Sequence, residues 1–518
     1  MERASSENEE LNLSTLEKHP VLVQTIAKFL DFKSYHSLTY TSKTVQSNIE
    51  ITRPPIEIKY NVKNPSRESF QEEIKKFKFL SKFGKCFSSV HINHKVFFDT
   101  KFDTQSFLDN TPNVRKIVLH ANPVRYSLRF PERVQTLVFG DSYSMPYGCI
   151  NSLKPLRQLR NISFLSKLYK SSNTAAQLID FFSTHKLRKL KLKADILADI
   201  EFAEPGAAAK ILDSIQCEKL TIIGYNFKQI HYDYYDRYPE INGFFKALSR
   251  LLDRLKCLKC FSLRFFGYLT IQNVKDMIPT LPSRLQKIKL DGNFLGLVRD
   301  SDDMGARQYY LGEFLSKFSD LTYMNLEMNY FSSESITGFA QGLKHNHKLD
   351  ELCFGNNNIG DAGFINLCAY IPSTVRKLYV HGCEIGDNGI EVLLSPSLFS
   401  KNRKVDHCDH LRLLALGLNG NPVTDIGAKF LAQYFSFNTM LQDIGISFIY
   451  MSDAGLLQLR DSILGLKEKK LRNIFLFSSF TCCKIITERT IAEFRKTLPD
   501  TVLLTTSTSL ARQVKTFD

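Results

Sequence analysis

The sequence has no tryptophan, no apolar run long enough to cross a membrane, and no basic tract. Because a spanning helix needs about 20 apolar residues, none is expected. The polar and acidic opening MERASSENEE also lacks the basic-then-apolar order of a secretory signal. The 11 cysteines are scattered and odd in number, which favours reduced thiols over a disulfide framework. We therefore expect a cytoplasmic or nuclear protein.

Positive charge is in excess, with 68 Lys and Arg against 53 Asp and Glu and a net charge of +15. Such an excess is typical of proteins that bind nucleic acid or acidic partners. The lysines are spread along the whole chain, and no known nucleic-acid-binding signature occurs. We therefore favour acidic protein partners, and expect no binding to nucleic acid or membrane.

One apolar pattern, LxxLxLxxN, recurs along the chain. Its clearest copies are LTYMNLEMN from Leu321, LDELCFGNN from Leu349, VRKLYVHGC from Val375 and the copy from Leu413 to Asn421. The two apolar residues that lie two apart share one face of a short strand and enter the core. The Asn side chain can bond backbone groups of the following turn, a role that Cys383 fills only weakly. Helical spacing follows at 336–343 and 364–371, so each repeat reads as strand, turn and helix.

Weaker copies precede these. They are Val114, Ile117, Leu119; Val134, Leu137, Phe139; Leu159, Ile162, Phe164; Leu187, Leu190, Leu192; Leu258, Phe261, Leu263; and Leu285, Ile288, Leu290. Two later copies, at 441–446 and 471–476, have Ile449 and Ser479 in the Asn position, as degenerate capping repeats do. The pattern predicts an α/β solenoid in which each repeat covers its neighbour's apolar side chains.

Residues 321–476 resemble the ribonuclease-inhibitor class of leucine-rich repeat. The resemblance implies a horseshoe with parallel strands on the concave face and helices on the convex face. The segment FPERVQTLVFGDSYSMPYG is similar to the FNIP variety of leucine-rich repeat, through Leu137, Phe139, Gly140 and Asp141.

The segment before the repeats, HPVLVQTIAKFLDFKSYHSLTYTSKTVQSNIE, has apolar residues at helical spacing. It resembles an F-box, which docks substrate receptors onto the SKP adaptor of cullin-based ubiquitin ligases. The usual Leu-Pro opening is replaced by His19-Pro20, and the usual Trp is missing. The resemblance implies adaptor contacts by Pro20, Leu22, Val23, Ile26, Leu30 and Leu38. A helical cap closing the solenoid is the alternative.

The chain is thus predicted to comprise a disordered N-terminus at 1–14, an F-box-like helical module at 15–52, a linker and N-terminal cap at 53–85, a leucine-rich-repeat solenoid at 86–506 and a C-terminal tail at 507–518.

Within the solenoid, residues that flank the core positions of LxxLxL point away from the core. The candidates for client binding are Lys189, Lys191, Lys193, Arg264, Lys287, Lys289, Tyr323, Glu327, Glu351 and Tyr379. The basic ones favour an acidic or phosphorylated client. A solvated face and a tyrosine-rich loop at 224–240 are the alternatives.

Two insertions, at 296–310 and 395–410, interrupt the repeats. The first contains DSDDMG, but Met304 and Leu311 stand where calcium ligands are needed. The second contains His407, Cys408 and His410, which are too few for zinc. Cys257 and Cys260 form a lone CxxC. No metal or cofactor is expected.

No nucleotide-binding, metalloprotease or hydrolase motif is found, so we expect a binding protein and no enzyme. The favoured function is a substrate receptor of an SKP, cullin and F-box type ubiquitin ligase. The alternatives are a repeat protein without a ligase role, such as an inhibitor or sensor, and a GTPase activator of the leucine-rich-repeat type. The end of the chain, SLARQVKTFD, lacks the acidic tail that is common in such activators.

Overall fold

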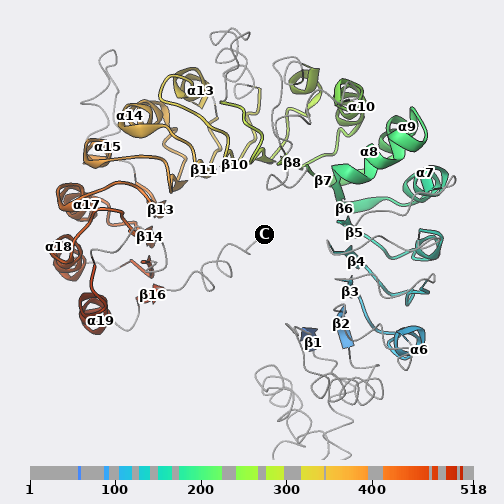
Figure 1. Cartoon of the computed structure of the whole chain (residues 1–518), viewed down its shortest axis with the longest axis horizontal. Helices are drawn as coiled ribbons and strands as arrows, with labels where there is room; N and C mark the ends of the chain where they lie inside the picture. The colour runs from blue at the N-terminus through green and yellow to red at the C-terminus, as the bar shows by residue number, and fades with distance from the viewer. Residues whose placement is uncertain are drawn as a thin grey trace, which may run out of the picture. The chain divides into compact units, whose positions relative to one another are not determined.

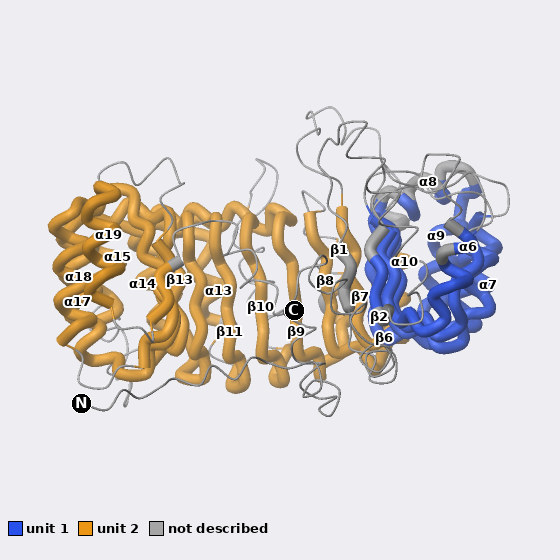
Figure 2. The backbone as a smooth tube through the Cα atoms, turned by 90° about the horizontal axis from the view of Figure 1, so that it is seen from below, with its two compact units in different colours: residues 1–217 blue, residues 218–518 orange. Residues whose placement is uncertain are grey.

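The computed structural model describes most of the repeat region in two compact units, residues 1–217 and 218–518 (Figure 2). The described residues are 56–59, 87–92, 104–119, 128–140, 150–165, 174–224, 241–265, 273, 276–296, 317–343, 346–394, 412–465, 470–476, 486–498 and 502–505. The predicted N-terminus, F-box-like module and C-terminal tail lie outside them. So do the tyrosines of the loop at 224–240 and nearly all of both insertions.

Unit 1 contains parallel strands that pair with their neighbours in sequence order. The strands are β1 (Ile56–Lys59), β2 (Phe87–Ile92), β3 (Lys116–Leu119), β4 (Thr136–Phe139), β5 (Asn161–Phe164) and β6 (Leu187–Lys193). The helices between them are α6 (Thr104–Asp109), η3 (Asn151–Leu153), α7 (Thr174–Thr184), α8 (Ala194–Ala203) and α9 (Ala207–Ser214). Strand β1 falls within the segment expected to be linker and cap.

Unit 2 repeats the same arrangement, with its helices on one side of the parallel strands (Figure 1). Its strands are β7 (Cys217–Ile223), which begins at the unit boundary, β8 (Cys260–Arg264), β9 (Lys287–Lys289), β10 (Tyr323–Asn325), β11 (Glu351–Cys353), β12 (Lys377–Tyr379), β13 (Ala415–Gly417), β14 (Asp443–Gly445), β15 (Asn473–Phe475) and β16 (Leu503–Thr505). Its helices are α10 (Ile241–Arg254), η6 (Ile278–Thr280), α13 (Ile336–Leu343), α14 (Gly360–Tyr370), α15 (Asp387–Glu391), η7 (Val392–Leu394), α17 (Asp425–Phe437), α18 (Asp453–Gly465) and α19 (Glu488–Thr497).

The apolar positions of LxxLxL form continuous columns in the core, as predicted. From β9 to β15 in unit 2, the middle position of each strand pairs with the middle position of the next. This column is Ile288, Met324, Leu352, Leu378, Leu416, Ile444 and Ile474, and all of its members are fully or almost fully buried. Burial of each such side chain stabilises the fold by about 2 kcal/mol.

The repeat that contains β7 was not recognised from the sequence pattern. Cys217, Leu220 and Ile222 occupy the three core positions of β7 and are buried like the leucines of other repeats. This copy was not recognised because its first core position is a cysteine, whose small buried thiol replaces the expected leucine.

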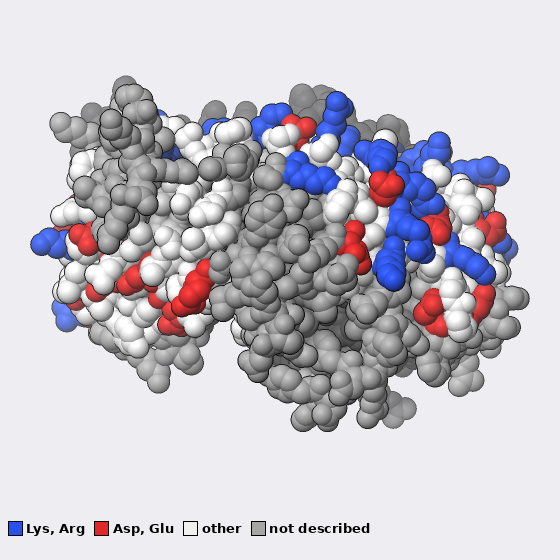
Figure 3. Space-filling view, turned by 90° about the horizontal axis from the view of Figure 1, so that it is seen from above, with Lys and Arg blue, Asp and Glu red and all other residues white. Residues whose placement is uncertain are grey.

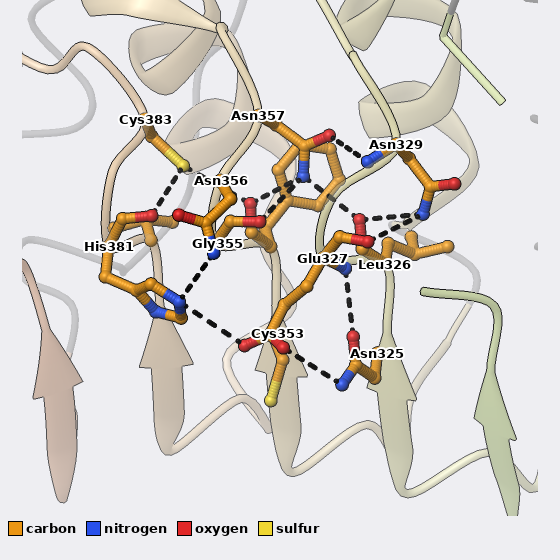
Figure 4. Close-up of polar contacts among 12 residues, drawn as sticks. Asn325, Leu326, Glu327, Asn329, Cys353, Gly355, Asn356, Asn357, His381 and Cys383 are labelled. Atoms are coloured by element: carbon orange, nitrogen blue, oxygen red, sulfur yellow. Dashed lines mark hydrogen bonds and ion pairs between the residues drawn. The ribbon is translucent and has the colours of Figure 1, made fainter. Parts of the chain in front are cut away.

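A ladder of buried asparagines holds the turns after the strands of unit 2 (Figure 4). The Asn357 side chain donates to the carbonyls of Leu326 (3.0 Å) and Phe354 (2.7 Å) and accepts from the backbone N–H of Asn329 (3.0 Å). Cys383 takes the Asn position in the next repeat, and its thiol donates to the Phe354 carbonyl at 3.2 Å. Burial raises the pKa of the Cys383 thiol to about 12, so the thiol stays protonated and serves as this donor.

A second ladder runs through the first turns of the helices. The Asp387 carboxylate accepts from the backbone N–H of Thr424 and of Gly427, each at 2.9 Å. Asp425 accepts from the Ser452 N–H of the following repeat at 2.8 Å in the same way. Because the first N–H groups of a helix have no partner within the helix, each aspartate caps the helix of the next repeat.

Candidate functional site

We use the name strand face for the side of each sheet that is opposite to its helices. In unit 2 the strand face carries two rows of side chains in register. One row is Lys287, Tyr323, Glu351 and Lys377, and the other is Lys289, Asn325, Cys353 and Tyr379. A third row follows where the strands end, with Arg264, Asp291, Glu327 and His381. The alternation of LxxLxL therefore places the predicted candidates of this unit on one face.

Two lysines of β9 flank the Tyr323 ring on β10. The Nζ atoms of Lys287 and Lys289 lie 5.5 and 5.1 Å from the ring centroid. Ammonium groups at this distance from an aromatic ring are attracted by about 0.5–1 kcal/mol at an exposed site. The arrangement presents two positive charges beside one aromatic ring, which suits a partner with a carboxylate next to an apolar group.

Arg264 is already engaged by a carboxylate, which the sequence did not indicate. Its Nε donates to both oxygens of Asp291 at 2.8 Å, and its guanidinium lies 5.3 Å from the centroid of the Phe265 ring. Burial raises the pKa of Asp291, while the charge and hydrogen bonds of Arg264 oppose that rise. Arg264 therefore contributes less positive charge to the strand face than the sequence suggests.

Glu327 and His381 meet across an intervening strand (Figure 4). The His381 Nε2 atom lies 3.7 Å from Glu327 Oε1, and the Asn356 amide lies 3.2 Å from the same ring nitrogen. A Cβ atom at Gly355 would collide with the His381 ring. Glycine at this position therefore allows the imidazole to reach Glu327.

The remaining candidates of unit 2 are half-buried and held by neighbours. Glu351 lies 3.5 Å from Lys377 Nζ. The Tyr379 ring covers Gly417, where an added Cβ would lie 2.8 Å from Cδ1 of the ring. Burial, together with the charge of Glu351, raises the pKa of Tyr379 above its ordinary value. Tyr379 therefore presents a neutral phenol to any partner.

In unit 1 the three predicted lysines lie on the strand face of β6. Lys189 is exposed, whereas Lys191 and Lys193 are half-buried. Lys189 pairs in register with Asn161 and Lys191 with Ser163, so β5 places no charge opposite these two lysines. The sequence analysis grouped these three lysines with Arg264, Lys287 and Lys289. Those three residues belong to unit 2, whereas the lysines of β6 belong to unit 1. That all six form a single site stays a prediction.

The structure adds polar residues that the sequence analysis did not select. Asp291 and Asp443 stand at strand-face positions, and Asp443 accepts from the Asn473 amide at 2.6 Å. Their positions relative to LxxLxL are a signal that could have identified both. The adaptor-binding candidates of residues 15–52 lie outside the described residues.

The described residues contain no group of three or more His, Cys, Asp or Glu side chains placed to hold a metal ion. Neither Cys257 nor Cys260 forms a disulfide bond, and Cys257 lies in the turn before β8. None of the described helices has the length and apolar character needed to cross a membrane.

Parallel strands with buried leucine columns, an asparagine ladder and helices on one side define a leucine-rich-repeat solenoid of the α/β class. The family model described as Leucine Rich repeat matches residues 372–394, which contain β12 and α15. No curated protein matches the chain. Among solved structures, the complex of TLR13 with ssRNA13 is similar at 13% identity and a TM-score of 0.37. The match covers 71% of this chain, and the chain spans 43% of the length of that structure.

Proposed function

We propose that the chain is a protein-binding scaffold whose strand face holds a client protein. The observation that supports the proposal most is the strand face of unit 2, where charged and aromatic side chains of successive strands stand in register. Lys287, Lys289 and Tyr323 form a preorganised cluster there. Aromatic and charged groups held in place by neighbours lose little freedom on binding, which favours recognition of a partner.

The finer part of the proposal concerns the segment before the repeats. Residues 15–52 resemble an F-box, and an F-box followed by leucine-rich repeats is the arrangement of ubiquitin-ligase substrate receptors. In this proposal Leu22, Val23, Ile26 and Leu30 contact an SKP-type adaptor, while the repeats select the client. The chain itself performs no catalytic step.

The adaptor contact is tested with the full-length chain and a purified SKP adaptor. Wild type is expected to bind, and Leu22→Glu/Leu30→Glu to bind at least about tenfold more weakly, since charge is costly in an apolar interface. Ile426→Glu is the control: Ile426 is 61% exposed on α17, and its change is expected to leave adaptor binding intact. Isothermal titration calorimetry measures all three. Absence of wild-type binding, or equal binding by the double variant, contradicts the adaptor role.

A further inference from the structure

In unit 1, strands β3–β6 carry charged residues of one sign. From β3 to β6, every charged residue of the strands and of the residue just before each strand is basic. These residues are Arg115, Lys116, Arg160, Lys186, Arg188, Lys189, Lys191 and Lys193. The acidic residues of unit 1 with described side chains lie on helices α6 to α9, in the turn that follows α8, or, for Glu132, in the turn before β4. All charged residues on the strand face of β3–β6 are therefore basic.

The arginines form a row along the edge where the strands begin. We name this row, Arg115, Gln135, Arg160 and Arg188, the leading edge. Its members are adjacent, because Gln135 N–H donates to the Arg115 carbonyl, Arg160 N–H to Gln135 and Arg188 N–H to Arg160. All four side chains are exposed. No carboxylate of the described residues forms an ion pair with these arginines, in contrast to Arg264 with Asp291 in unit 2.

The groups between the charges are small and uncharged. On the strand face, Thr136, Asn161 and Ser163 are half-buried, and the Asn161 amide donates to Thr136 Oγ1 at 3.0 Å. Val118 and Val138 supply small apolar positions beside them. The surface thus offers positive charge, hydrogen-bonding groups and room for short side chains.

We propose that the leading edge and strand face of β3–β6 bind an extended, carboxylate-rich peptide segment of the client. The inference rests on the proposed function and names the chemistry of the partner. Guanidinium groups bind carboxylates through paired hydrogen bonds, and a field of one sign speeds the arrival of an acidic segment.

Spacing agrees with a peptide that crosses the strands. Neighbouring strands lie about 4.8 Å apart, and an extended chain rises about 3.3 Å per residue. Arg160 and Arg188 are one strand apart, and Arg115 and Arg160 are two. Acidic residues at every second or third position of the peptide therefore meet successive arginines.

The absence of aromatic side chains favours a peptide over single-stranded nucleic acid. In the described strands β3–β6 the aromatic residues are Phe139 and Phe164, and both are buried in the core. Proteins that bind single strands use exposed aromatic rings on which bases stack. The described residues of β3–β6 offer basic charge without such rings on the strand face.

Fluorescence anisotropy tests the inference with the full-length chain and a labelled Glu-rich peptide of about 12 residues, longer than the width of four strands. A Gln-rich peptide of the same length and a single-stranded RNA are the comparison probes. The Glu-rich peptide is expected to bind, less tightly at high salt because ions screen the contacts. Arg160→Glu/Arg188→Glu is expected to weaken binding at least about tenfold.

Lys246→Glu/Arg250→Glu on α10 is the matched control, since it changes the net charge equally. Both residues are exposed on the helix side, where Figure 3 shows a gathering of Lys and Arg. This control is expected to stay within about twofold of wild type. Thermal unfolding checks that the variants fold. If Arg160→Glu/Arg188→Glu does not fold, Arg160→Gln/Arg188→Gln takes its place.

Equal weakening by the strand and helix variants would overturn the inference, because only net charge would then matter. RNA binding that is stronger than peptide binding and lost in the strand variant would assign the surface to nucleic acid instead. If wild type captures the adaptor and the clients but does not bind the Glu-rich peptide, this inference is overturned and the proposed function stands. Loss of adaptor and client binding by wild type overturns the proposed function, whatever the peptide does.

Discussion

At the residue scale, the pair of Arg264 and Asp291 shows how one strand-face position depends on its neighbour. The Asp291 side chain is 3% exposed and the Arg264 side chain 33%. A buried carboxylate is costly unless a partner compensates its charge. Arg264 therefore serves the stability of the repeat in addition to any contact with a client.

Replacement of the arginine tests this role. Arg264→Met is expected to lower the free energy of unfolding at pH 7 by about 2 kcal/mol, less than for a fully buried pair because Arg264 is partly exposed. Arg376→Met is the control, since Arg376 and Asp350 form an exposed pair, and its expected effect is below about 0.5 kcal/mol. Urea denaturation of both variants and wild type gives the comparison.

The effect of Arg264→Met depends on pH in a defined direction. Burial raises the folded-state pKa of Asp291 above its ordinary value, and loss of Arg264 raises it further. The folded state then binds a proton at pH values where the unfolded state does not, so stability falls as pH rises through this window. The loss of unfolding free energy caused by Arg264→Met is expected to be largest at neutral pH and smaller near pH 5. An equal deficit at both pH values would contradict the account.

The asparagine ladder gives a second test at this scale. Asn357→Ala removes an amide that satisfies buried backbone groups of two repeats, at an expected cost of about 3 kcal/mol. The neighbouring Asn358 is exposed, and Asn358→Ala is expected to change stability by less than about 0.5 kcal/mol. Chemical denaturation measures both variants. Similar stabilities for the two would show that the ladder contributes little.

At the scale of elements, the spacing LxxLxL was sufficient to predict most strands and their core columns. The periodicity succeeded because residues two apart in a strand point to the same face, so apolar residues at this spacing mark the face that is buried. It missed β7, where Cys217 heads the pattern, and it did not find β1, β2 or β16. It also did not explain the recurring Gly and Asp of IGDAG, IGDNG and VTDIG, whose roles depend on contacts between successive helices.

Those contacts make a testable claim about glycine. A Cβ atom at Gly427 would collide with Asp387 Oδ1, the group that caps α17. Gly427→Ala is expected to cost about 2 kcal/mol through this clash. Gly465 at the end of α18 has no atom within 4 Å of an added Cβ, and Gly465→Ala is expected to change stability by less than about 0.5 kcal/mol. Thermal unfolding that ranks the two in the opposite order would contradict the capping role.

Side-chain partners on the strand face were less predictable than the strands. Sequence alternation placed Tyr323, Glu351 and Tyr379 on the correct face, but the neighbours of each residue depend on the register between strands. The ion pair of Arg264 with Asp291 and the contact of His381 with Glu327 across Gly355 both follow from that register. A single strand's sequence carries no such information.

At the scale of the whole molecule, we propose that one chain combines two functions. The repeats supply a strand face with fixed charged and aromatic groups, and residues 15–52 supply the proposed adaptor contact. The leading edge belongs to unit 1 and the cluster around Tyr323 to unit 2, and both carry positive charge. Both are expected to favour acidic segments of a client.

The most direct test of the central claim is quantitative co-purification with the full-length chain, with the SKP adaptor as internal reference. Lys189→Glu/Lys191→Glu/Lys193→Glu changes the strand face of β6, and Lys210→Glu/Lys246→Glu/Arg250→Glu makes the same change of net charge on helices α9 and α10. The account predicts that the strand-face variant loses the clients of wild type but keeps the adaptor, while the helix variant keeps both. An unchanged set of clients in the strand-face variant would contradict it.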